Sequence, residues 1–239
     1  MQQRLPSRLD PPIGFAHRGA RAHAPENTLE AFLLAQRLGA TGLETDAWIT
    51  ADGVVVLDHD GVVGSRLRRR RPISELSRRQ LPDHIPSISE LIENSDRRLH
   101  ISVDVKDPAA LSALIDQCRE VDREIETRLW LCHHDWNLVA SWRRLTDARL
   151  VDSCRFSKMS EGPERRALSL REAGIDAINM HHSDWNGGLV TLFHRFDLYT
   201  FGWDMQQEHV LRECLRMGLD AIYSDWTDRM MEVIALETG

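Results

Sequence analysis

Eight short apolar segments, mostly separated by segments of helical pattern, constrain the fold of this chain more than any other feature of its sequence. They are centred near residues 15, 45, 103, 131, 151, 178, 200 and 222. Strands that alternate with helices form parallel sheets, and eight such units in 239 residues are typical of a (β/α)₈ barrel, the TIM-barrel form of an α/β fold. We therefore expect functional residues at the carboxyl ends of these strands.

A β-hairpin arm is expected after the second of these strands. Asp52 and Gly53 form a turn signal between the apolar segments 43–49 and 54–57, so the second segment should fold back antiparallel on the first. A turn centred on Ala51 and Asp52 would place His59 opposite Glu44.

The chain is predicted to have a flexible leader at residues 1–12 and a single barrel domain at residues 13–239. Residues 61–90 are interpreted as a surface excursion, because about thirty residues bury too little apolar area to fold alone. Residues 66–71 are all arginine except Leu67. Two interpretations of this basic run stay open: a solvated loop, or a loop that attracts anionic head groups.

Composition narrows the possible functions. A net charge of −7 argues against non-specific nucleic-acid binding, which needs a clustered excess of positive charge. The sequence has no run of eighteen apolar residues and no apolar signal region at its N-terminus, which predicts a cytoplasmic protein without stable membrane insertion. The four cysteines are widely spaced and are expected to be reduced, mostly buried thiols. The oligomeric state stays open.

Charged side chains gather at the expected strand exits. In chain order they are His17, Arg18, Glu44, Asp46, His59, Asp104 and Lys106. Three carboxylates at one barrel mouth repel one another unless a cation joins them, and oxygen ligands suit Mg²⁺ or Ca²⁺ rather than zinc. We therefore predict a divalent-cation site formed by Glu44, Asp46 and Asp104.

Two histidines beside such an ion can act as general acid and general base, because imidazole titrates near working pH. Arg18 and Lys106 would neutralise an anion bound to the metal. Phosphate is the anion that suits a metal, an arginine fork and a lysine together. These residues therefore indicate metal-assisted phosphoryl transfer on a small-molecule substrate.

The motifs of residues 14–60 closely resemble those of the glycerophosphodiester phosphodiesterase family. They are H-R-G with A-P-E-N-T and A-F, then E-T-D, then T-x-D-G-x-x-V-x-x-H-D. Weaker markers extend the resemblance over nearly the whole chain: I-P-S-I-S-E-L at 85–91, V-D-V-K at 103–106, T-F-G-W-D at 200–204 and G-L-D-A-I-Y-S-D at 218–225.

The resemblance implies a (β/α)₈ barrel that uses a divalent cation to hydrolyse glycerophosphodiesters to glycerol 3-phosphate and an alcohol, a reaction of lipid and glycerol metabolism. Carried over by position, it implies His17 and His59 as the acid–base pair and Glu44 and Asp46 as metal ligands. Arg18 and Lys106 match phosphate contacts. Asn27 matches an asparagine near the family's site, although it could equally be a helix cap.

The chain departs from the family pattern at two places. Asp104 stands where the family usually has a glutamate, so this shorter side chain could reach the metal through water. Trp203-Asp204 replaces the more usual Trp-Thr-x-Asn, and Trp203 is a candidate hydrophobic wall for the substrate. The pairs His133-His134 and His181-His182 also lie at strand exits, where side-chain alternation would allow only one of each pair to face inward.

Two other functions stay open. One is a lysophospholipase D-type reaction on a lipid-bearing diester, which needs an apolar surface beside the barrel mouth. The other is a non-catalytic barrel that binds phosphorylated ligands, although a binding module has no need of an acid–base pair. For the hydrolase, the attacking group could be water or the neighbouring glycerol hydroxyl, which would form a transient cyclic phosphate.

Overall fold

Eight parallel strands form a closed ring in the computed structural model, which describes residues 4–64 and 70–239. The ring strands are β1 (Ile13–Ala16), β2 (Gly42–Ile49), β6 (His100–Val105), β7 (Leu129–His133), β8 (Arg149–Cys154), β9 (Ala177–His181), β10 (Tyr199–Trp203) and β11 (Ala221–Ser224). They follow the order β1-β11-β10-β9-β8-β7-β6-β2, and pairing of β1 with β2 closes the ring. The predicted (β/α)₈ barrel is confirmed.

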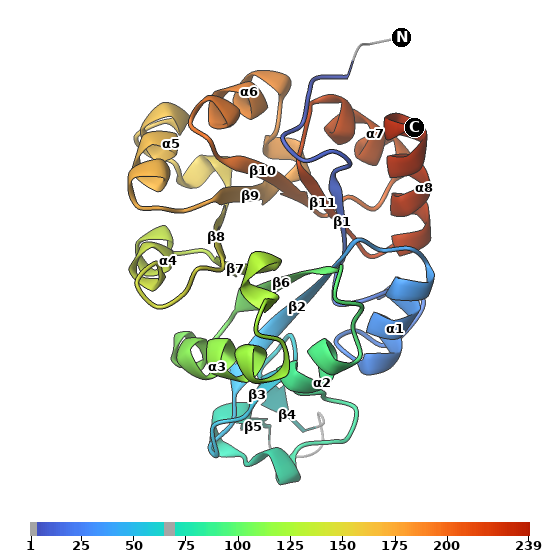
Figure 1. The fold of residues 1–239 in the computed structure, drawn as a ribbon, viewed down its shortest axis with the longest axis vertical. Coiled ribbons are helices and arrows are strands. Elements are labelled where there is room, and N and C mark those ends of the chain that lie inside the picture. Colours follow the sequence, from blue (N-terminus) through green and yellow to red (C-terminus); the bar gives the residue numbers. More distant parts are fainter. Residues whose placement is uncertain (1–3, 65–69) are drawn as a thin grey trace.

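Helices surround the ring on its outside (Figure 1). They are α1 (Leu29–Arg37), α2 (Ile88–Glu93), α3 (Leu111–Val121), α4 (Trp136–Trp142), α5 (Pro163–Glu172), α6 (Gly187–Arg195), α7 (Glu208–Arg216) and α8 (Thr227–Thr238). Short 3₁₀ turns lie at η1 (Ile73–Glu75), η2 (Arg78–Gln80), η3 (Pro108–Ala110), η4 (Ile125–Thr127), η5 (Phe156–Lys158) and η6 (His182–Asp184). Local signals set several helix starts: the Thr28 hydroxyl accepts from the Ala31 N–H, and Ser87 and Glu90 form a capping box.

Aromatic side chains fill the interior of the barrel. The rings of Phe15 and Tyr223 stack with their centroids 4.7 Å apart, and Trp130 meets Phe201 edge-on at 4.8 Å. Gly42 makes room for this packing, because a Cβ atom there would lie 2.4 Å from the Phe15 ring. Tyr223 also lines the pocket at the carboxyl ends of the strands, so the aromatic core forms part of that pocket's floor.

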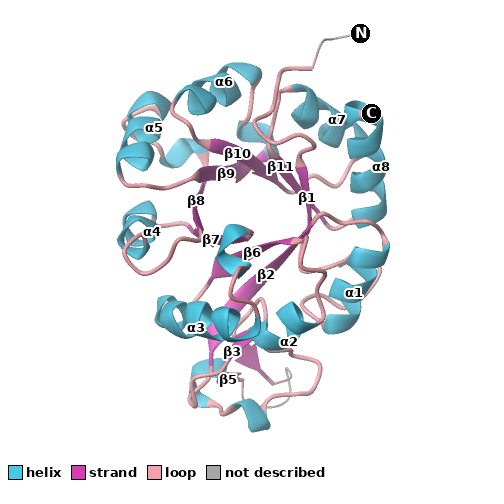
Figure 2. Cartoon of the chain, viewed as in Figure 1, coloured by secondary structure: helices cyan, strands magenta, loops and turns pink. Residues whose placement is uncertain are grey.

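The predicted hairpin arm is present outside the ring (Figure 2). Strand β3 (Val55–Leu57) pairs antiparallel with β2 and aligns Leu57 with Ala47. Continued along the chain, this register sets His59 level with Thr45, so the predicted pairing with Glu44 is wrong by one residue. The reason is the turn, in which the Thr50 N–H donates to the Val54 carbonyl and centres the hairpin on Asp52.

The excursion after the hairpin has a small apolar cluster of its own. Strands β4 (Val62–Val63) and β5 (Arg71–Pro72) form a two-stranded sheet that the sequence did not predict. The buried residues of the cluster are Val56, Ile73, Leu76, Leu81 and Ile85. Most of the basic run at 66–71 lies outside the described residues.

All four cysteines are free, and three of them are buried while Cys154 is half-buried, as predicted.

The segment before β1 contacts the rest of the chain: the Leu5 N–H donates to the Arg216 carbonyl at 2.9 Å, and the Leu9 N–H donates to the Asp220 side chain at 3.2 Å. Within residues 4–64 and 70–239, no helix is long and apolar enough to cross a membrane.

Candidate active site

The carboxyl ends of the strands surround a pocket of about 480 Å³, a volume suited to a small ligand. Its lining residues are His17, Arg18, Arg21, Glu44, Asp46, Ser102, Asp104, Lys106, Cys132, Ser153, Asn179, Trp203, Asp204, Gln206 and Tyr223. Most of the predicted site residues are therefore brought together. His59 and Asn27 are not among those that line the pocket.

His17 leaves β1 directly, and its backbone N–H donates to the Ser224 carbonyl of β11 at 3.0 Å. Its ring nitrogen Nδ1 lies 2.6 Å from Asp225 Oδ1, and Nε2 lies 3.8 Å from Glu44 Oε2. Burial opposes the charge of the imidazole, but Glu44 and Asp225 outweigh it, so the pKa of His17 is raised. This histidine is therefore well suited to hold a proton near neutral pH.

Glu44 is a buried carboxylate whose surroundings disfavour its ionised form. Burial raises the pKa of Glu44 to about 7, and repulsion from Asp46 and Asp104 acts in the same direction. The neighbouring His17 and the Arg18 backbone N–H, which donates to Oε2 at 2.9 Å, oppose the rise. A further cation at this place would favour the ionised carboxylate.

Asp46 and Asp104 are direct neighbours, because β2 and β6 pair in parallel with these two residues in register. The Lys106 ammonium contacts both, at 3.1 Å from Asp46 Oδ1 and as a hydrogen-bond donor to Asp104. Burial lowers the pKa of Lys106, but the attraction of Asp104 and Asp46 for its ammonium group is stronger, so the pKa is raised. Arg18 Nε lies 3.1 Å from the other Asp46 oxygen, so two cations compensate this carboxylate.

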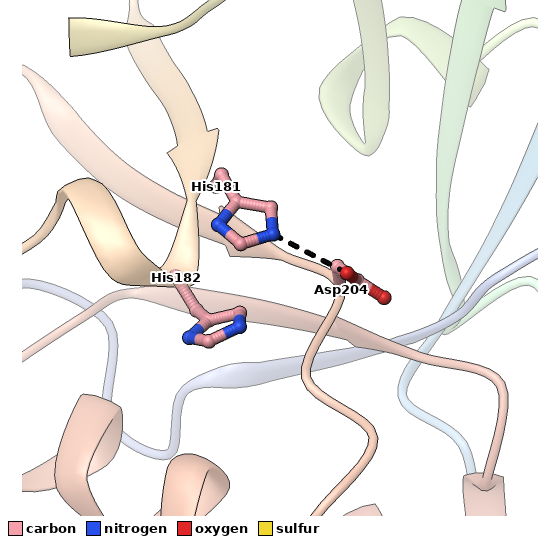
Figure 3. Close-up of side chains that lie close together, drawn as sticks. All are labelled: His181, His182 and Asp204. Atoms are coloured by element: carbon pink, nitrogen blue, oxygen red, sulfur yellow. Dashed lines mark hydrogen bonds and ion pairs between the residues drawn. The ribbon is translucent and has the colours of Figure 1, made fainter.

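The chemistry of these donors fits a hard divalent cation. Glu44, Asp46 and Asp104 line one pocket and offer only oxygen ligands, the set that Mg²⁺ and Ca²⁺ prefer. Their ligand atoms are not compact, however, since Lys106 lies between two of them. In the described part of the chain, three ligand atoms within 4.8 Å of one another occur only at His181, His182 and Asp204 (Figure 3).

His59 is exposed and does not line the pocket. Its side chain is 41% exposed, and Nδ1 lies 2.8 Å from Asp60 Oδ1. The loop that carries it is tied to the site, because the Asp58 N–H donates to the Asp46 carbonyl at 3.1 Å. The structure therefore brings the His59 backbone close to the carboxylates but leaves its imidazole in contact with solvent.

Asn27 supports a carboxylate from behind. Its amide donates to Asp46 Oδ2 at 3.1 Å, and its carbonyl oxygen accepts from the Thr45 hydroxyl at 2.8 Å. The cap of α1 is Thr28, so Asn27 is not a helix cap. It holds Asp46 in place.

Sequence reasoning missed a polar network beside His17, formed by Asp225 together with Arg21 and Gln206 of the pocket lining. Asp225 is the partner of His17, and its only signal was the family marker that ends at this residue. Arg21 lies 3.5 Å from the same aspartate, and Gln206 accepts the Asp225 backbone N–H at 3.0 Å. The contacts of Asp225 with His17 and Arg21 join residues about 200 positions apart, and its contact with Gln206 joins two different strand-exit loops, so no local pattern could reveal them.

The side chains of His181 and His182, at the end of β9, do not point to opposite sides. Their ring centroids are 4.3 Å apart, and both side chains lie beside Asp204. Strand β9 ends at His181 and the η6 turn begins at His182, so the alternation of a strand does not apply. Neither His181 nor His182 is among the residues that line the catalytic pocket, although Asp204 beside them is. In the other pair, His133 and His134 both line a small neighbouring pocket, rather than one of the two as alternation predicts.

Comparison with known proteins identifies a family for this chain. The Glycerophosphoryl diester phosphodiesterase family matches residues 17–229. A glycerophosphodiester phosphodiesterase of Caldanaerobacter subterraneus is 27% identical over 244 residues, which cover 92% of this chain and 96% of the relative. Glycerophosphodiester phosphodiesterase 1 of Homo sapiens is 31% identical over 165 residues, which cover 52% of this chain and 49% of the relative.

Solved structures share the barrel. The glycerophosphodiester phosphodiesterase of Thermotoga maritima has a TM-score of 0.79 at 20% identity and covers 92% of this chain and 97% of its own. An Oleispira antarctica phosphodiesterase in complex with the product sn-glycerol-3-phosphate has a TM-score of 0.76 at 21% identity and covers 94% and 97%. Because the family match spans most of the sequence, this chain belongs to the glycerophosphoryl diester phosphodiesterase family and is a phosphoric diester hydrolase.

Proposed function

We propose that this enzyme hydrolyses glycerophosphodiesters to glycerol 3-phosphate and an alcohol in the pocket at the barrel mouth. The observation that carries the proposal is the convergence there of a histidine–aspartate pair, three carboxylates and the two cations Arg18 and Lys106. The relative in complex with glycerol 3-phosphate supports the same product. The proposal treats residues 13–239 as one catalytic domain.

Glu44, Asp46 and Asp104 would hold one divalent cation, Mg²⁺ or Ca²⁺, with Asn27 orienting Asp46. When bound, such an ion polarises the phosphoryl oxygens and offsets their charge. Arg18 and Lys106 now compensate the carboxylates and would turn their donors to the phosphate. Trp203 would contact the glycerol or alcohol part of the substrate.

The two histidines would move the proton. Because Asp225 engages Nδ1 of His17, Nε2 is the ring atom left to serve the pocket. The raised pKa of His17 suits a proton donor to the leaving alkoxide, and His59 would take the proton of the attacking oxygen. One P–O bond forms to that oxygen, and the P–O bond to the alcohol breaks.

The attacking group is either water or the glycerol hydroxyl next to the phosphate. A substrate analogue without that hydroxyl distinguishes the two routes. Full turnover of the analogue would rule out obligatory attack by the hydroxyl, whereas loss of turnover with retained binding would support a transient cyclic phosphate.

A coupled assay for glycerol 3-phosphate tests the function. It should cover a panel of water-soluble diesters with Mg²⁺, Ca²⁺ and Mn²⁺ in turn. Lysophospholipids should be tested in parallel through release of the head-group alcohol, because their other product is lysophosphatidic acid rather than glycerol 3-phosphate. We expect product from the soluble diesters and its loss in His17→Ala. Turnover of lysophospholipids alone would favour the lysophospholipase D-type reaction, and the absence of product with every substrate and ion would favour a phosphoester-binding barrel.

A further inference from the structure

A second group of metal-ligating side chains lies apart from the three carboxylates. His181 is the last residue of β9 and His182 comes directly after it, while Asp204 follows the neighbouring strand β10 (Figure 3). One ligand atom from each lies within 4.8 Å of the others, and His181 Nε2 is 3.3 Å from Asp204 Oδ2. Two ligands that share a tetrahedral ion at about 2.0–2.1 Å are themselves about 3.3 Å apart, so this pair already has the required spacing.

Neighbouring groups hold the His181 ring in place. The Trp203 ring meets it edge-on, with the centroids 4.7 Å apart and the planes at 84°. The Ser183 hydroxyl lies 2.8 Å from Nδ1. The Ser183 backbone N–H also donates to Nδ1 at 3.2 Å, so the neutral ring carries its proton on Nε2. Metal binding at Nε2 therefore requires the proton to move to Nδ1, where the Ser183 hydroxyl can accept it.

Asp204 is held in an unusual backbone conformation. Its φ of 63° lies in the left-handed region, which residues other than glycine seldom adopt and which concentrates at functional sites. The Gln206 amide lies 3.3 Å from Oδ1, so Oδ2 is the oxygen presented to His181. The aspartate is half exposed, which gives an ion a path from solvent.

The nearest positive charge to consider is that of Arg155, whose guanidinium lies 5.8 Å from the centroid of the Trp203 ring. The Asp184 carboxylate lies 2.7 Å from Arg155 Nε and compensates its charge. This ion pair reduces the repulsion between Arg155 and a bound metal ion.

We propose that His181, His182 and Asp204 bind one transition-metal dication of the Zn²⁺ class. Two imidazole nitrogens and one carboxylate oxygen suit Zn²⁺ or Co²⁺ better than Mg²⁺ or Ca²⁺. Three protein ligands leave a coordination position for water or for an oxygen of a ligand. Asp204 and Trp203 line the catalytic pocket, so the ion would stand at its wall. This site does not depend on the proposed reaction.

Calorimetric titration of the full chain with Zn²⁺, in an excess of Mg²⁺ that competes for the carboxylates, tests the proposal. We expect one Zn²⁺ per chain, bound at least about tenfold more weakly by His181→Ala, by His182→Ala and by Asp204→Asn. Asparagine tolerates the left-handed conformation of residue 204, so this variant removes the charge and keeps the backbone.

The controls separate this site from the others. His209→Ala changes an exposed histidine of α7, and Glu44→Gln changes the carboxylate site; both should bind Zn²⁺ like the unaltered protein. The proposal is overturned if no Zn²⁺ binds, if the three variants bind it unchanged, or if only Glu44→Gln loses it.

A measurement on the unaltered protein guards against misfolded variants. Diethylpyrocarbonate modifies accessible histidines, and mass spectrometry locates the modified residues. Zn²⁺ should protect His181 and His182 several-fold while His209 stays reactive. Equal reactivity of all three with and without Zn²⁺ would contradict the site even if the variants fail to fold.

Discussion

At the scale of single residues, His17 shows how neighbours tune one imidazole. Its backbone N–H is held by β11 and its Nδ1 by Asp225, and Glu44 lies on the side of Nε2. Burial alone would lower its pKa, so the raised pKa depends on these two carboxylates. Asp225 is therefore a positioning residue that acts through the histidine.

Asp225→Asn should lower kcat at least about tenfold and move the alkaline limb of the pH profile to lower pH. The carboxylate raises the pKa of His17, so its loss lowers that pKa, and the proton donor is lost at a lower pH. The pH dependence of kcat and kcat/KM measures both effects.

Asp228→Asn is the matched control, because Asp228 pairs with His23 at 3.1 Å and is not among the residues that line the pocket. An alkaline limb that stays in place in Asp225→Asn, with only kcat reduced, would show that Asp225 does not act through the charge of His17.

Asp104 contributes one of three carboxylates, and its shorter side chain contacts Lys106. Asp104→Asn should raise the Mg²⁺ or Ca²⁺ concentration that gives half-maximal activity at least about tenfold, because a neutral amide is a weaker ligand for a hard ion. Activity measured against ion concentration tests this. Asp83→Asn, in the exposed part of the excursion, should leave the curve unchanged, and an unchanged curve for Asp104→Asn would remove this residue from the cation site.

At the scale of elements, the first two strands fit together because Gly42 has no side chain. Strands β1 and β2 pair where the ring closes, and they carry His17, Glu44 and Asp46 into the pocket. The Phe15 ring occupies the space that a Cβ atom of residue 42 would need. The packing of the barrel interior and the position of the site residues are therefore linked.

Gly42→Ala should destabilise the protein by about 1–3 kcal/mol, because an overpacked interior forces neighbouring side chains to shift. Urea denaturation measures the loss. Phe15→Leu replaces the ring by a smaller side chain and makes room for the Cβ atom of residue 42. The double variant should therefore lose less stability than the sum of the two single variants, as a double-mutant cycle measures. Strict additivity of the two changes would contradict a direct contact between residues 15 and 42.

At the scale of the whole molecule, one buried carboxylate makes stability depend on pH. Asp152 of β8 is fully buried, neither of its oxygens has a hydrogen-bond partner, and Arg166 lies 3.8 Å away. Burial raises the pKa of Asp152 to about 6. Since the folded-state pKa exceeds the unfolded value, the fold favours the protonated form and loses stability as pH rises from about 4 to above 6.

Asp152→Asn should therefore gain stability relative to the unaltered protein as pH rises, by up to about 3 kcal/mol at pH 8 compared with pH 4. Thermal or urea unfolding across this range measures the difference. Asp83→Asn, at an exposed position, should show no such trend. A constant difference between pH 4 and pH 8 would mean that the pKa of Asp152 is the same in the folded and unfolded states.

The sequence alone was sufficient for the barrel, the hairpin arm and seven of the residues that line the pocket. Strand and helix periodicity, turn residues and caps act over a few neighbours, and closure of eight parallel strands brings their carboxyl ends to one mouth. The tertiary structure was needed for the pairing of His17 with Asp225, the exposure of the His59 ring and the grouping of His181, His182 and Asp204. These features depend on closure of the barrel, on where each strand ends and on side-chain rotamers. All three are set by contacts between residues far apart in the chain.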